Sequence, residues 1–108
     1  MKNIYNLDTS KKISAKNVRD AIVECFFQAH CLDTGLDEEE FKNRLTKNYC
    51  KIIVEKAFQE IGGDFDHPTK TAMFKVINHL AEFSKAFRDP EIIHKHKKEI
   101  EYLLNLLD

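Results

Sequence analysis

The sequence has little of what most β-rich folds and secreted scaffolds require. It contains no tryptophan, three glycines and two prolines in 108 residues. Sandwiches and barrels need frequent turns rich in glycine and proline, so this scarcity argues against them and favours long helices. No segment approaches the roughly 20 apolar residues of a membrane-spanning helix. The first residues lack the apolar core of a signal peptide, so we expect neither secretion nor a membrane partner.

The three cysteines, Cys25, Cys31 and Cys50, do not indicate a disulfide framework. Their number is odd and no C-x-x-C spacing occurs, whereas secreted disulfide scaffolds use an even and denser set. We therefore predict a cytoplasmic protein with reduced thiols.

Neither sign of charge dominates, because 17 basic and 18 acidic side chains leave a formal net charge of −1. Domains that bind nucleic acid usually carry a basic excess. Binding to nucleic acid is therefore disfavoured, although the segment 85–98 is locally basic. Hydrophobic residues make up 43% of the chain, which is close to the roughly 45–50% of globular domains. The chain can therefore bury a core.

Local signals divide the first half of the chain into an arm and two helices. Residues 1–13 are polar and carry no strong pattern. Ser14 is a suitable N-cap for a first helix, and Gly35 is suited to the turn that ends it. A second helix is predicted from about Asp37, and Gly62-Gly63 stops it after Ile61.

Two proline-containing signals mark the helices of the second half. Asp66 is the expected N-cap of a third helix, with Pro68 in its first turn. Asp89-Pro90 ends that helix and begins a fourth, which runs to the last residues. Four helices joined by short connections predict an all-α fold. We expect an antiparallel four- to five-helix bundle, with the arm at 1–13 and a single domain at 14–108.

The second predicted helix has an apolar ladder in which every step is four residues. Such steps overshoot a turn of 3.6 residues, so the apolar stripe drifts by about 40° per step. The helix must therefore wrap across its neighbours or break near residues 46–48. The ladder consists of Phe41, Leu45, Tyr49, Ile53, Ala57 and Ile61.

The first predicted helix is apolar on two sides. Val23, Phe26 and Phe27 fall outside its main stripe, and Phe27 lies nearly opposite Val18. Two interpretations remain open. These side chains form an exposed patch, which usually marks an association surface, or the first helix is central and buried all round. The main stripe consists of Val18, Ala21, Ile22, Cys25, Ala29 and Leu32.

No residue pattern indicates an enzyme. G-x-S-x-G, the phosphate-binding P-loop and G-x-G-x-x-G are all absent. His94 and His96 form an H-x-H pair, but residues two apart on a helix do not face each other. We therefore expect no catalytic residues, no bound metal and no cofactor.

His96 interrupts the apolar stripe of the last helix and has two interpretations. It is either a structural histidine at the edge of the core or the centre of a ligand site. A ligand site would take Cys25 or His79 from facing helices. The residues that would complete a metal site are missing from the same stripe, so the structural interpretation is favoured.

These observations predict a small cytoplasmic interaction module without catalytic activity. It would self-associate as a homodimer, or bind another protein, through an apolar face of the first helix. Hydrophobic burial would supply affinity, and complementary charge would set the register. The alternative is a metal- or ligand-binding bundle centred on His96. The predicted surface comprises Val23, Phe26, Phe27 and Phe58, with Lys95, Lys97 and Lys98 opposite an acidic run such as Asp37–Glu40 of a second copy.

Overall fold

Four helices make up most of the part of the chain that the computed structural model describes, which is residues 13–34, 44–83 and 90–107. No strand occurs in these ranges. The prediction of an all-α fold is confirmed. The predicted arm lies outside the described residues except for Ile13, which packs against the core. The helices are α1 (Ala15–Thr34), α3 (Arg44–Glu60), α4 (Lys70–Phe83) and α5 (Pro90–Asn105).

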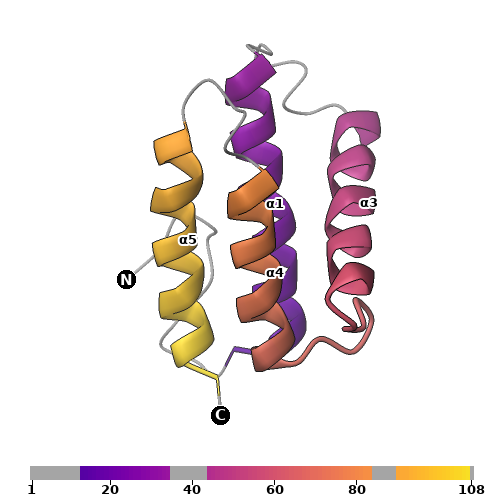
Figure 1. Cartoon of the computed structure of the whole chain (residues 1–108), viewed down its shortest axis with the longest axis vertical. Coiled ribbons are helices and arrows are strands. Elements are labelled where there is room, and N and C mark those ends of the chain that lie inside the picture. Colours follow the sequence, from indigo (N-terminus) through magenta and orange to yellow (C-terminus); the bar gives the residue numbers. More distant parts are fainter. Residues whose placement is uncertain (1–12, 35–43, 84–89, 108) are drawn as a thin grey trace.

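Helices α1 and α4 each contact the three other helices. Both pack against α3 and α5, and they also contact each other. In Figure 1, α3 and α5 lie on opposite sides of the pair formed by α1 and α4. The radius of gyration is 13.2 Å, and about 13 Å is expected for a compact domain of this length. The helices therefore form one compact body with α1 and α4 between the other two.

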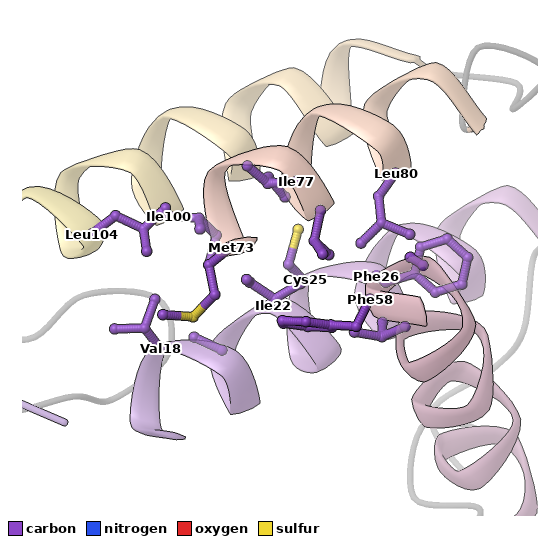
Figure 2. Packing of buried hydrophobic residues seen from close by; sticks show 14 of the residues in the cluster. Val18, Ile22, Cys25, Phe26, Phe58, Met73, Ile77, Leu80, Ile100 and Leu104 are labelled. Atoms are coloured by element: carbon purple, nitrogen blue, oxygen red, sulfur yellow. The ribbon is translucent and has the colours of Figure 1, made fainter. Parts of the chain in front are cut away.

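The core lies between the helices and takes side chains from all four (Figure 2). The described side chains of the main stripe predicted on the first helix are all buried, and α4 and α5 supply further buried apolar residues. A helix with such a stripe is held mainly by burial of that face, because isolated short helices are marginal in water. The fully buried residues include Val18, Ile22, Cys25, Met73, Val76, Ile77, Leu80, Ile100, Leu103 and Leu104.

The structure buries only part of the four-residue ladder. Ala57 is buried, and Ile53 and Ile61 pack against the core, as the ladder predicts. Tyr49 is 52% exposed, so the prediction is wrong at that position, where Cys50 is buried instead. Helix α3 is also continuous through residues 46–48, so the predicted break is absent there. Residues 37–43 lie outside the described ranges.

Both the start of α1 and the end of α3 follow the sequence signals. The hydroxyl oxygen of Ser14 accepts a hydrogen bond from the backbone N–H of Asn17 at 3.1 Å, which confirms the N-cap. At the end of α3, Gly63 N–H donates to the carbonyl of Phe58 at 2.8 Å, and Gly62 N–H donates to that of Gln59 at 3.1 Å. This paired arrangement closes the last turn, and it places Gly62 in the left-handed region with φ 77°.

The start of α4 is capped by Thr69, so the expected Asp66 cap is wrong. Thr69 Oγ1 accepts from the backbone N–H of Ala72 at 3.1 Å. The backbone N–H of Asp66 instead donates to the carboxylate of Asp64 at 2.9 Å, which forms a turn before the helix. Pro68 is buried just ahead of the cap. At α5, Pro90 is the first helical residue as predicted, while Asp89 lies outside the described residues.

Gly62→Ala is expected to lower the free energy of unfolding by about 1 kcal/mol, since a left-handed backbone disfavours any residue with a Cβ. A Cβ at this position would meet no atom within 4 Å, so the cost is conformational rather than steric. Gly62→Asn should cost less, because asparagine tolerates this region. Urea unfolding gives the free energy of unfolding of the wild type and of both variants. An alanine variant as stable as the wild type would contradict the left-handed conformation of Gly62.

Thr69→Ala is expected to cost about 1 kcal/mol, which is typical for the loss of an N-cap hydrogen bond. The matched control is Asp66→Ala, which removes an exposed side chain that does not cap α4. Its effect should stay within about 0.5 kcal/mol. If thermal unfolding shows a larger loss of stability for Asp66→Ala than for Thr69→Ala, the N-cap of α4 is misassigned.

Candidate functional site

The aromatic side chains that the sequence offered as an interaction surface belong to the core. Phe26 and Phe27 are each 1% exposed and Phe58 is fully buried. Only Val23 is partly exposed. The prediction that these three phenylalanines form an exposed surface is therefore wrong, because Phe26 and Phe27 of α1 and Phe58 of α3 lie in the core. Lys47 lies over the ring of Phe27, with its Nζ 5.3 Å from the ring centroid.

A cationic clamp ties the connection between α3 and α4 to α1. Arg19 donates to the backbone carbonyl of Phe65 at 2.9 Å, and its guanidinium lies 4.5 Å from the centroid of that ring. The same guanidinium pairs with Asp20 at 2.9 Å. The Phe65 ring meets Phe58 edge to face at 5.7 Å. No local pattern predicts this clamp, because Arg19 and Phe65 are 46 residues apart in the chain.

The clamp borders a groove of about 380 Å³ between α1, α3 and the residues that connect α3 to α4. Its lining includes Val23, Glu24 and Lys51 besides the clamp residues. Lys51 also lies 4.0 Å from Glu55. Ligand pockets normally offer an apolar wall with a few convergent polar groups. Within the lining, Arg19 pairs with Asp20, whereas Lys51 and Glu24 contact Glu55 and Gln28, which lie outside it.

The three residues of the predicted ligand site serve different interfaces. Cys25 is fully buried in the core. His79 is half-exposed on α4, and its Nε2 lies 2.7 Å from Oε2 of Glu60 on α3. His96 is buried in α5, where Glu24 of α1 acts on it. His79 therefore contacts α3, whereas the charged group on another helix that acts on His96 is Glu24 of α1.

A metal centre at His96 finds no support in the described residues. Among them, no three histidine, cysteine or carboxylate side chains come together around one position. A structural zinc site needs four ligands, and a catalytic site needs three with an open position. Burial lowers the pKa of His96, with a further contribution from Lys95, while Glu99 and Glu24 oppose this effect. The imidazole is therefore held in its neutral form.

The lysines predicted on the last helix do reach solvent. Lys95 and Lys98 are exposed, whereas Lys97 is partly buried, with its Nζ 3.9 Å from Glu101. Among the described side chains, neither Lys95 nor Lys98 forms an ion pair. Their charge is therefore available to a partner.

Two large apolar side chains continue the line of these lysines along α5. Tyr102 is 54% exposed and Leu106, just past the end of the helix, is 43% exposed. The spacings of three and four residues from Lys95 to Leu106 keep the set on one side of a helix. We call Lys95, Lys98, Tyr102 and Leu106 the outer α5 stripe. The sequence analysis did not single out Tyr102 and Leu106, because their exposure depends on which side of α5 packs against other helices.

A second pair of exposed apolar residues lies on α3. Tyr49 and Ile52 are 52% and 50% exposed. The ring of Tyr49 lies 5.6 Å from that of His30, which in turn stacks on Phe26 at 6.4 Å. Phe26, His30 and Tyr49 thus form a row of ring contacts that begins in the core. Tyr49 is the exposed end of this row.

No family model, curated protein or solved structure matches this chain. In the part of the chain that the structure describes, no helix combines the length and the apolar character needed to cross a bilayer.

Phe27→Asp is expected to abolish folding, since a buried carboxylate without a partner is strongly unfavourable. Phe27→Ala should lower the free energy of unfolding by about 3–5 kcal/mol. The control Ile52→Ala, at a half-exposed position of α3, should change it by about 0.5 kcal/mol. Circular dichroism with urea unfolding measures these changes. A folded Phe27→Asp protein would show that this ring is not part of the core.

Proposed function

We propose that this protein is a cytoplasmic helical interaction module without catalytic activity, and that it self-associates through the outer α5 stripe. In this proposal the four helices form an antiparallel bundle, which turns one side of α5 to solvent. The observation that carries the proposal is the composition of the stripe. Two exposed lysines, which form no ion pair with another described residue, continue into two exposed apolar side chains, Tyr102 and Leu106.

The stripe has the two components that protein interfaces combine. Tyr102 supplies a large amphipathic ring, and tyrosine is enriched among the residues that dominate binding energy. Leu106 adds apolar area beside it. Lys95 and Lys98 supply positive charge, which selects partners and sets register more than it adds affinity. A partner therefore needs negative charge followed by apolar side chains along one line.

The chain itself contains such a sequence. Asp37–Glu40 is its densest acidic run, and Phe41 follows directly. These residues lie outside the described ranges, so only their sequence enters the proposal. A second copy would bring this run to Lys95 and Lys98. In a two-fold symmetric dimer, the same contact forms twice.

The exposed pair on α3 is less suited to this role. Tyr49 already packs on His30, and Lys47 and Lys51 lie over the rings of Phe27 and Phe65. The cations next to this pair are therefore engaged within the chain. Helix α3 provides a matched control surface with similar exposed residues.

The proposal predicts a dimer whose affinity depends on charge at α5. Light scattering over a dilution series of untagged protein should show a concentration-dependent dimer. Lys95→Glu with Lys98→Glu should raise Kd at least about tenfold, which corresponds to about 1.4 kcal/mol. The double variant Tyr102→Ser, Leu106→Ser should also raise Kd at least about tenfold, although it leaves the net charge unchanged.

The control is Lys56→Glu with Lys75→Glu, which makes the same change in net charge at exposed positions of α3 and α4. It should leave the dimer intact. Adding Glu39→Lys and Glu40→Lys to the α5 charge reversal should restore association. A monomer at all concentrations, or equal weakening by the control pair, would overturn the proposal. Weakening only by substitutions at Tyr49 and Ile52 would place the interface on α3.

A further inference from the structure

The apolar end of the outer α5 stripe lies just outside its helix. Helix α5 ends at Asn105, and Leu106 follows with 43% of its side chain exposed. The last carbonyl groups of a helix have no partner within that helix, and helix ends fray for this reason. A residue that binds from this place therefore needs contacts beyond the helix to keep a defined orientation.

Backbone hydrogen bonds carry the last turn of α5 past Leu106. The N–H of Leu106 donates to the carbonyl of Leu103 at 3.1 Å, and the N–H of Leu107 donates to that of Leu104 at 3.1 Å. The side chain of Leu107 packs against the core. Leu106 is thus held between its own bonded N–H and an anchored neighbour.

A lysine from another helix completes this arrangement. Lys70 is the first residue of α4, and its Nζ donates a hydrogen bond to the backbone carbonyl of Leu107 at 3.4 Å. Helices α4 and α5 pack against each other, and the start of α4 lies at the same end of the molecule as the end of α5 (Figure 1). The contact therefore ties the segment after α5 to the neighbouring helix.

The charge of Lys70 suits the end of α5 better than the start of its own helix. The N-terminal end of a helix carries a partial positive charge, whereas the C-terminal end carries a partial negative charge and favours a cation. The last turn of α5 contains no basic residue. Lys70 therefore supplies from α4 the cation that α5 lacks.

We propose that Lys70 is a positioning residue for self-association, which holds the carbonyl of Leu107 and thereby presents Leu106 beside Tyr102 on the outer α5 stripe. This inference rests on the proposed function, because it concerns the same surface. A side chain that is already held in place loses less conformational freedom on binding, so its contact adds more to affinity. Lys70 acts through Leu106 and not through a contact with the partner.

The first test compares the dimer Kd of Lys70→Met and Lys70→Arg with that of the wild type by light scattering. Methionine keeps an unbranched side chain but cannot donate, whereas arginine keeps a charged donor. Lys70→Met should raise Kd about threefold to tenfold, and Lys70→Arg should keep the wild-type Kd. The control Lys75→Met removes the same charge from an exposed position of α4 and should leave Kd unchanged.

A double-mutant cycle with Leu106→Ser separates positioning from direct contact. Leu106→Ser alone should raise Kd, and adding Lys70→Met should raise it no further, because the two residues act as one unit. An equal increase of Kd by Lys70→Met with and without Leu106 would overturn the proposal. A Leu106→Ser protein with the wild-type Kd, or equal weakening by Lys75→Met, would overturn it as well.

Hydrogen exchange measured by NMR tests the positioning role independently of the proposed function. Lys70→Met should speed up exchange at the amides of Leu106 and Leu107 and leave that of Ile100, in the interior of α5, unchanged. A wild type that is monomeric at all concentrations would remove the proposed function, while faster exchange would still show that Lys70 holds this segment. Unchanged exchange in Lys70→Met would overturn the positioning role in either case.

Discussion

The fold depends on the burial of apolar side chains on more than one side of α1. Its main stripe is buried wherever it is described, and Phe26 and Phe27 are buried beyond that stripe. A large aromatic ring contributes more apolar area than any other kind of side chain, so two adjacent rings strongly favour neighbours on both sides of the helix. Helix α4 also contacts the three other helices, whereas α3 and α5 lie on opposite sides of the pair formed by α1 and α4. The outer faces of α3 and α5 are left for solvent or for partners.

This constraint explains where polar chemistry occurs in the molecule. Next to α1, polar groups are paired: Arg19 holds Asp20 and the carbonyl of Phe65, and Glu24 accepts from Gln28. His96 is the exception in character, since it is a titratable side chain that is buried on α5. On the exposed side of α5, Lys95 and Lys98 have no ion-pair partner among the described residues. The buried histidine and the exposed lysines thus lie on two sides of one helix.

The groove beside the clamp illustrates why concavity alone does not define a site. It has the size of a small-ligand pocket, but Arg19 is already paired with Asp20 and Lys51 lies near Glu55. A ligand would have to replace those contacts. By contrast, Tyr102 and Leu106 remain exposed although burying them would be favourable. This is why the outer α5 stripe, rather than the groove, carries the functional proposal.

The sequence by itself determined the helical class, most of the buried stripes and several helix ends. These follow from local rules: Ser14 bonds a backbone N–H three residues away, and Gly62-Gly63 closes a turn on the residues just before it. It also showed that His96 interrupts an apolar stripe. Only the tertiary structure decided which of two apolar faces is interior. Phe27 is buried while Tyr49 is exposed, because burial depends on which helices are neighbours. Likewise, His79 pairs with α3 and Glu24 of α1 acts on His96, since contacts between distant segments are set by packing and not by spacing along the chain.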